Sequence, residues 1–332
     1  MAEKRVSIAL ATYNGERFLG EQLDSFLSQT RLPDELVVGD DSSSDGTLAI
    51  LRAFAARAPF PVRIVVNSPG LGPAGNFAAT IARCDGDVVL LSDQDDIWRP
   101  DKIARMVAWL DAHPRHLMVL HDAALVDGSG RALGVTMGQQ LEAVGTPPAL
   151  GLVAGCCMAL DRRLARFYAS APKTRYHDAW LTSVADLLGT RGYIAEPLIE
   201  YRRHGANVSV SFMSSAERAT RWRRLRERIA LALAQGAGSA LAWSVQDRSS
   251  AVAALEQNRA EVAAVLGETP VESALCELRA RVARDRRRLA IHEAPRRARP
   301  ALLLSALRGG VYRGGGGLAR FARDLLDAVR HG

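Results

Sequence analysis

The sequence predicts an α/β protein with a mostly parallel central sheet flanked by helices, followed by a helical C-terminal region. Three observations support this class. Apolar runs alternate with helical periodicity over the first hundred residues, as in strands that are joined by crossover helices. Polar clusters follow several of these runs, and beyond residue 214 the pattern becomes helical and rich in Arg and Ala.

The N-terminal half predicts its elements in a regular order. Strands are expected at 6–11, 35–39, 62–67 and 88–92, and helices at 20–28, 47–56 and 76–83. Further along, we expect strands at 117–120 and 193–197, a turn at 127–130 and a helix from 177 to 189. In open parallel sheets ligands bind beyond the carboxyl ends of the strands. The polar clusters after the first, second and fourth strands therefore predict a binding site at one edge of the sheet.

The length and charge of the chain indicate two parts. The 332 residues exceed the usual size of one domain, so we predict a catalytic domain at 1–214 and a basic helical region at 215–332. Lys and Arg number 21 against 24 Asp and Glu in the first part, and 22 against 12 in the second, giving −3 and +10. Helices of the second part are expected near 215–235, 251–266, 270–293 and 317–330.

The basic C-terminal region has two interpretations. One is a packed helical appendage with a solvated charged face, and the other is contact with an anionic membrane surface or a partner. The region lacks the aromatic stacking pattern of a nucleic-acid module, so no nucleic acid is expected as a partner.

The four cysteines show no CxxC spacing, which predicts reduced thiols and no structural zinc. No secretory signal or clean membrane span is apparent in the sequence. We therefore expect a cytoplasmic protein that is peripheral at the inner face of the cell membrane.

An acidic run is the most informative local feature. Asp93, Asp95 and Asp96 follow the apolar run at 88–91, so three carboxylates emerge where a buried strand reaches solvent. Carboxylates this close repel one another unless a cation neutralises them, and oxygen ligands suit Mg²⁺ or Mn²⁺. The alternative is an ordinary loop in which Asp96 caps the helix beginning near Pro100.

Several spaced motifs together resemble the family 2 glycosyltransferases over roughly residues 5–210. They are Ser-Ile-Ala-Leu-Ala-Thr-Tyr-Asn-Gly at 7–15, Leu-Ser-Gln-Thr at 27–30, Asp-Asp-Ser-Ser-Ser-Asp-Gly-Thr at 40–47, and Ser-Asp-Gln-Asp-Asp-Ile-Trp at 92–98 with Pro100 and Lys102. The resemblance implies a GT-A fold, an inverting transfer of the hexosyl type, a nucleoside diphosphate sugar donor and Mn²⁺ or Mg²⁺ as cofactor.

The same resemblance implies roles for individual residues. The residues implied to bind the nucleotide or the donor are Thr12, Tyr13, Asn14, Asp40, Asp41, Asp93, Arg202 and Arg203. The implied metal ligands are Asp95, Asp93 and His204. Among the nucleotide contacts, Asp41, with Asp40, would accept a hydrogen bond from a pyrimidine N3–H.

The resemblance also implies that Asp178 is the catalytic base, since it matches the family's acidic residue at the start of a helix. Direct displacement needs such a group to take the proton of the acceptor hydroxyl. Asp178 could equally serve as the N-cap of the helix it begins, and the two roles are compatible. The role of its neighbour His177 is left open between site and local structure. Helix capping is likewise the alternative for Asp45. His121 and Asp122 are expected at a strand end, near the donor sugar or in a turn.

The Asp-Gln-Asp-Asp-Ile-Trp form is most similar to rhamnosyltransferase-type members, which makes dTDP-rhamnose the leading donor and a UDP-hexose the alternative. A saccharide or lipid-linked saccharide of a surface polysaccharide, such as O-antigen, is the implied acceptor. The fold alone does not fix the donor, because a few pocket contacts decide it.

Two functions of other classes remain open in the sequence. The run from Gly70 to Gly75 fits G-x-G-x-x-G and precedes a helix, as in an NAD-dependent oxidoreductase. It follows the third strand instead of the first, and this function would leave the other carboxylates unexplained. The second is a non-catalytic sugar-binding protein, which would not need both metal and base candidates.

Overall fold

The computed structural model describes residues 3–151, 154–170, 174–204, 237–313 and 317–330. The chain divides into two compact units. The first comprises Met1–Phe212 with Gln257–Val271, and the second comprises Met213–Glu256 with Glu272–Gly332. The predicted domain boundary at 214 and the helix expected at 215–235 lie outside the described residues.

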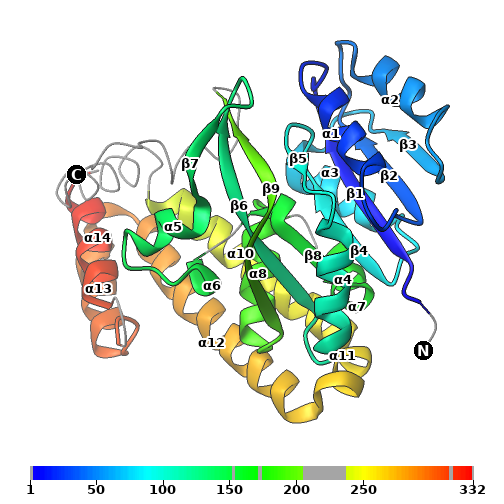
Figure 1. Cartoon of the computed structure of the whole chain (residues 1–332). Coiled ribbons are helices and arrows are strands. Elements are labelled where there is room, and N and C mark those ends of the chain that lie inside the picture. Colours follow the sequence, from blue (N-terminus) through cyan, green and yellow to red (C-terminus); the bar gives the residue numbers. More distant parts are fainter. Residues whose placement is uncertain (1–2, 152–153, 171–173, 205–236, 314–316, 331–332) are drawn as a thin grey trace. The chain divides into compact units, whose positions relative to one another are not determined.

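The first unit is built on a nine-stranded sheet (Figure 1) whose first half is parallel. This half contains β1 (Val6–Thr12), β2 (Glu35–Asp40), β3 (Val62–Val66) and β4 (Val88–Ser92), in the order β3-β2-β1-β4. All three pairings are parallel, and Thr12 lies opposite Asp40 at the carboxyl ends of β1 and β2. β1 and β4 are buried on both faces, as parallel strands covered by helices should be.

The second half of the sheet is mixed, and its strand order from β4 onward is β8-β6-β9-β5, with β7 beside β6. The strands are β5 (Ile97–Trp98), β6 (Met118–Asp127), β7 (Ala132–Thr136), β8 (Met158–Asp161) and β9 (Arg191–Arg203). β8 pairs antiparallel with both β4 and β6, whereas β6 and β9 run parallel, side by side. The predicted α/β class is confirmed, and the antiparallel pairings belong to this half.

Two of these strands are longer than their sequence patterns predict. β6 continues beyond 120 because Ala123, Leu125 and Val126 are also buried, so His121 and Asp122 lie within the strand and not after it. β9 extends to Arg203 and carries Pro197 next to a break in register with β6, a position where proline is tolerated.

The first unit also contains helices, several of which bury apolar side chains. Their bounds are α1 (Leu19–Leu27), α2 (Thr47–Ala55), α3 (Gly72–Ile81), α4 (Lys102–Ala112), α5 (Met137–Glu142), α6 (Pro148–Gly151), α7 (Arg162–Ala169), α8 (His177–Leu187) and α11 (Arg259–Leu266). In α1 the buried Leu19, Leu23 and Phe26 recur at helical spacing. A short 3₁₀ turn, Gly155–Cys157, precedes β8.

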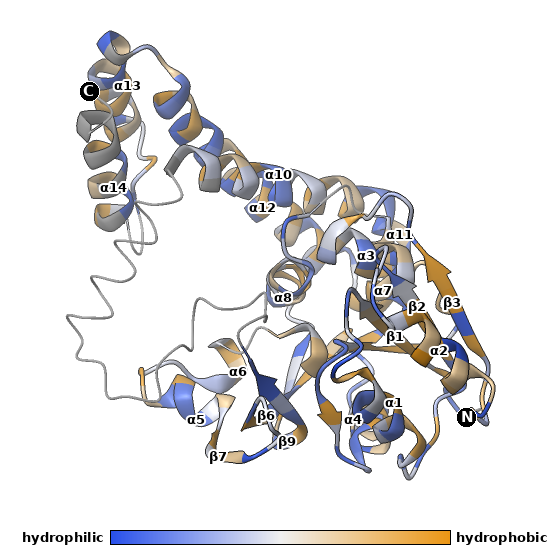
Figure 2. Ribbon diagram, turned by 90° about the horizontal axis from the view of Figure 1, so that it is seen from above, coloured by the Kyte–Doolittle hydropathy of each residue, from blue (hydrophilic) through white to orange (hydrophobic). Residues whose placement is uncertain are grey.

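The second unit is helical. It is formed by α10 (Ala237–Gln257), α12 (Glu268–Glu293), α13 (Arg299–Arg308) and α14 (Gly317–Arg330), with a 3₁₀ turn at Arg296–Ala298. α13 was not expected from the sequence, because its arginines and Pro300 obscure the helical pattern. Figure 2 shows both hydrophobic and hydrophilic stretches on this helix. None of the helices in the described ranges is long and apolar enough to cross a membrane.

Candidate active site

The carboxyl ends of β1 and β2 are joined by side-chain hydrogen bonds. The Thr12 hydroxyl donates to Asp40 Oδ2 over 2.8 Å. Asp40 also accepts from the backbone N–H of Ser43 (2.9 Å, Oδ1) and from its hydroxyl (2.6 Å, Oδ2). Asp40 is fully buried, and both of its oxygens are engaged within the protein. The geometry therefore makes Asp40 a residue that shapes the loop after β2.

The loop after β1 leaves the Tyr13 ring exposed, so that this ring can contact a ligand. Asn14 adopts a left-handed backbone conformation with φ of 46°, which asparagine tolerates, and its side-chain oxygen accepts from the Ser44 N–H over 2.8 Å. The neighbouring Tyr13 side chain is 59% exposed. Asp45 accepts from the N–H groups of Glu16 (3.2 Å) and Thr47 (3.0 Å), so the loops after β1 and β2 form one hydrogen-bonded mouth.

Asp41 holds the start of α3. Its Oδ1 accepts from the Leu71 N–H (2.7 Å) and the Asn67 side chain (3.1 Å), and its Oδ2 accepts from the Gly72 N–H (2.9 Å). The Leu71 and Gly72 N–H groups lie in the glycine-rich run at which a dinucleotide pyrophosphate would need to bind. Because the chain's own carboxylate occupies that helix start, the structure gives the oxidoreductase interpretation no support.

Gln94 connects the acidic loop after β4 to the loop after β1. Its side-chain oxygen accepts from the Tyr13 N–H (2.8 Å), and its side-chain nitrogen donates to the Tyr13 carbonyl (3.0 Å). A Cβ on Gly15 would lie 2.3 Å from the Gln94 oxygen, so this contact requires glycine at position 15. The two loops are therefore fixed to each other by one amide side chain.

Asp95 and His204 are in contact although 109 positions separate them in the sequence. His204 Nε2 lies 2.8 Å from Asp95 Oδ2, and both side chains are largely buried. The His204 ring also packs on Phe18 with 4.8 Å between ring centroids. The structure thus brings together two of the three residues predicted to bind a metal.

Arg202 makes hydrogen bonds to other residues of the protein. Its backbone N–H donates to Asp96 Oδ1 (3.2 Å), its Nε to the Asp95 carbonyl (3.1 Å) and a terminal nitrogen to Glu21 Oε2 (2.6 Å). Its guanidinium stacks over the Phe18 ring at 4.7 Å. Arg202 therefore orients the acidic loop, whereas the side chain of Arg203 is partly exposed at the end of β9.

The half-buried Asp93 forms an acidic group with the buried Asp96 and Cys156, in which one candidate ligand atom from each lies within 4.8 Å of the others. Burial and the charges of Asp95 and Asp178 raise the pKa of Asp93 to about 7. Burial, with the charges of Asp95 and Asp93, also raises the pKa of Asp96 well above its ordinary value. Asp96 thus belongs to this group and does not cap α4, whose N-cap is Asp101.

Lys102 supplies positive charge beside the acidic group. Its ammonium is fully buried, donates to the Cys156 carbonyl over 2.7 Å and lies 3.7 Å from the centre of the Trp98 ring. Burial lowers the pKa of Lys102 to about 8, against the attraction of the Cys157, Cys156, Asp96 and Asp93 charges. The ammonium attracts the carboxylates and partly offsets their mutual repulsion.

Asp178 lies in the first turn of α8, where its Oδ1 accepts from the Ala179 N–H over 2.7 Å. Its charge contributes to the raised pKa of Asp93, so the two carboxylates lie close enough to interact electrostatically. His177 stacks on Phe77 at 4.0 Å between ring centroids, and burial lowers its pKa. His121 is fully buried, and its Nδ1 contacts the Asp122 carbonyl at 2.6 Å.

The sequence interpretation missed the positions of Gln94 and Lys102. Lys102 shares a buried helix face with Ile103, Met106 and Leu110, and this spacing is a signal that could have predicted its burial. No comparable local signal marks Gln94, because its partner is a backbone group 81 positions away.

Comparisons with known proteins agree with this geometry. The family described as "Glycosyl transferase family 2" matches residues 7–167. The putative glycosyltransferase EpsE of Bacillus subtilis is 32% identical over 207 residues, which cover 60% of this chain and 73% of that protein. The chain belongs to glycosyl transferase family 2.

Other relatives of this family 2 glycosyltransferase match over shorter stretches. An uncharacterized protein of Mycobacterium tuberculosis is 32% identical over 127 residues, covering 38% of this chain and only 37% of that protein's length. The dTDP-rhamnosyl transferase RfbG of Shigella flexneri is 38% identical over 102 residues, covering 30% of this chain and 35% of that protein.

A solved structure shares the fold. Staphylococcus aureus TarS 1–349, crystallised with UDP-GlcNAc, superimposes with a TM-score of 0.51 at 16% identity, covering 86% of this chain and 90% of that one. The glycosyltransferase therefore has the GT-A fold predicted from its motifs.

Proposed function

We propose that this family 2 glycosyltransferase moves a sugar, with inversion, from a nucleoside diphosphate donor to a hydroxyl group of a saccharide or lipid-linked saccharide. The observation that carries the proposal is the contact between Asp95 and His204 in the acidic loop that also contains Asp93, together with the influence of the Asp178 charge on Asp93. This arrangement combines an electrostatic site for a diphosphate with a carboxylate suited to proton transfer.

Asp95, Asp93 and His204 would hold a divalent ion. Two carboxylates and an imidazole are a donor set that fits Mn²⁺, and Mg²⁺ is the alternative where the oxygen ligands dominate. When bound, the ion supplies positive charge that stabilises the diphosphate leaving group. Arg202 holds the backbone carbonyl of Asp95 and the carboxylate of Asp96, which fixes the loop from which these ligands project.

Asp178 acts as the general base in this proposal. Asp178 lies in the first turn of α8, where its carboxylate is held by the backbone at the start of the helix. The ionised carboxylate accepts the proton of the acceptor hydroxyl as that oxygen attacks the donor sugar. The hydrogen bond from the Ala179 N–H orients the carboxylate without removing its second oxygen from the site.

The mouth formed by the loops after β1 and β2 would bind the nucleotide. We assign stacking or edge contacts to the exposed Tyr13 ring, and backbone shaping to Thr12, Asn14 and Asp40, because their side chains bond within the loops. Asp41 orders the glycine-rich turn before α3 and leaves one lone pair, on Oδ2, for a base N–H. We assign the phosphate contact to Arg203, whose side chain is partly exposed at the end of β9.

dTDP-rhamnose is the leading donor, and the match to the dTDP-rhamnosyl transferase of Shigella flexneri supports it. A UDP-hexose is the alternative. The setting that we propose is surface polysaccharide synthesis of the O-antigen type, at the cytoplasmic face of the membrane. A non-catalytic sugar-binding protein is the competing function, and it would bind a nucleotide sugar without turning it over.

The proposal is tested by incubating the purified chain with Mn²⁺ and either dTDP-rhamnose or UDP-glucose, together with lipid-linked saccharide acceptors. Release of the nucleoside diphosphate and an inverted anomeric configuration in the product support it. Nucleotide-sugar binding without release, in the presence of every acceptor tried, would instead support the binding protein.

A further inference from the structure

We infer that the outward leucine face of α13, with the arginines around it, docks the protein on an anionic membrane surface. This inference concerns the second unit alone and does not depend on which sugar is transferred. It goes beyond the net charge of the C-terminal region because it assigns the contact to particular side chains.

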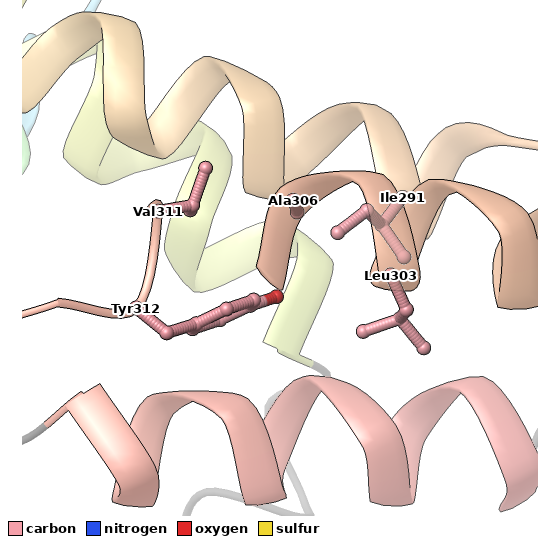
Figure 3. Packing of buried hydrophobic residues seen from close by; sticks show 5 residues of the cluster. All are labelled: Ile291, Leu303, Ala306, Val311 and Tyr312. Carbon is pink, nitrogen blue, oxygen red and sulfur yellow. The ribbon is translucent and has the colours of Figure 1, made fainter. Parts of the chain in front are cut away.

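One face of α13 is fixed inside the second unit. Leu303 and Ala306 pack in a buried cluster with Ile291 of α12 and with Val311 and Tyr312 (Figure 3). Tyr312 donates to the buried Asp324 of α14 over 2.8 Å. This packing sets the rotation of α13 about its axis, so its remaining leucines have to point outward.

The outward side chains are large and apolar. Leu304 is 48% exposed and Leu307 is 47% exposed on α13, and Leu318 at the start of α14 is 87% exposed. Leu304 and Leu307 are three positions apart, which places them on the same side of the helix. Exposed apolar side chains that lie together in one patch are a feature of interaction surfaces.

Charge identifies the kind of partner. The sequence from 294 to 323 contains no Asp, Glu or Lys, but it contains seven arginines, at 296, 297, 299, 308, 313, 320 and 323. Arg299 is used to bond the carbonyls of Ala294 and His292, whereas Arg297, Arg308 and Arg313 are exposed.

A second copy of this face would bring arginines against arginines, whereas phospholipid headgroups complement them. Apolar side chains flanked by arginines are typical of helices that lie in the membrane interface. With ten residues α13 is too short to span a bilayer, so it would lie on the surface with Leu304 and Leu307 inserted.

The test is co-sedimentation of the full chain with vesicles, without donor or acceptor. Phosphatidylcholine vesicles are compared with vesicles that also contain phosphatidylglycerol. The leucine variant is Leu304→Ser with Leu307→Ser. The matched control replaces two similarly exposed apolar residues of the first unit, Leu133→Ser with Val144→Ser, whose side chains are 42% and 45% exposed. Circular dichroism verifies that both variants retain the helical content of the parent.

We expect the parent and the control to bind the anionic vesicles and not the neutral ones, and the leucine variant to bind at least tenfold more weakly. Equal binding by the leucine variant and the parent would overturn the inference. The inference would also be overturned if the parent did not bind vesicles but formed a dimer, and if the leucine variant did not form that dimer. The face would then join two copies of the chain.

Discussion

His204 Nε2 lies 2.8 Å from Asp95 Oδ2, although the two residues are 109 positions apart in the sequence. The contact closes the site at the carboxyl ends of the strands, because β9 delivers His204 to the loop that follows β4. Arg202 reinforces it by bonding the Asp95 carbonyl over 3.1 Å. Contacts within the protein therefore hold the acidic loop on both its side chains and its backbone.

The Asp178→Asn variant tests the base. It keeps the shape of the side chain and should leave nucleotide binding intact, while turnover falls on the order of 10²–10⁴-fold because the amide cannot accept the proton. Steady-state kinetics beside nucleotide titrations measure both effects. Asp186→Asn, an exposed position on the same helix, is the control. Undiminished turnover in Asp178→Asn would remove this residue from catalysis.

The Gly15→Ala variant tests the connection made by Gln94. The added methyl group would displace the Gln94 side chain and break both of its hydrogen bonds to Tyr13. Two neutral hydrogen bonds contribute about 1–3 kcal/mol together, so we expect nucleotide affinity to fall roughly tenfold. Gly20→Ala is the control, since nothing lies within 4 Å of its Cβ position. An equal loss in both variants would mean that the Gln94 contact is irrelevant to binding.

The raised pKa of Asp93 predicts a pH dependence of metal binding. Because burial and the charges of Asp95 and Asp178 bring this pKa to about 7, the carboxyl group is largely protonated below that pH. A metal ion competes with this proton, so Mn²⁺ affinity should rise as the pH increases through about 7 and then level off. Calorimetric titrations with Mn²⁺ at a series of pH values measure it. An affinity that stays flat through this range would contradict the prediction.

The lowered pKa of Asp324 predicts that the protein loses part of its stability in acid. Burial alone would raise its pKa, but hydrogen bonds from His292, Arg288 and Tyr312 hold the pKa at about 2. A carboxyl group whose pKa is lower in the folded than in the unfolded protein stabilises the fold at pH values above its unfolded pKa, near 3.9. This stabilisation is lost as the pH falls towards 2. Its size is about 2 kcal/mol.

Urea unfolding of Asp324→Asn measures this contribution. The variant should lose at least that much free energy of unfolding at neutral pH, because the charge of the buried Arg288 is left without its partner. The exposed Glu293→Gln variant is the control. If both variants unfold at the same urea concentration, the account of this ion pair is wrong.

Local patterns predicted the strands of the first half of the sheet and the polar groups at their ends. The strand at 88–92 and the acidic run after it are both local features, since apolar residues and carboxylates stand next to each other in the sequence. The family resemblance then suggested that Asp95 and His204 act together, and the structure places them in contact.

Long-range partners explain what the sequence did not reveal. Asp40 and Arg202 resemble ligand-binding residues by type, but their bonds to Thr12 and Glu21 depend on how distant segments pair. The length of β6 and the burial of Lys102 likewise follow from neighbouring strands and helices. A local sequence pattern does not specify which distant segments will come into contact.

The most direct test of the central claim is a calorimetric titration of the parent and of Asp95→Ala with dTDP and with UDP, each with Mn²⁺ and again with a chelator. The account predicts that the parent binds one pyrimidine diphosphate only with Mn²⁺ and that Asp95→Ala loses this binding. Binding by the parent that is unchanged in chelator, or an Asp95→Ala variant that binds as tightly as the parent, would contradict it.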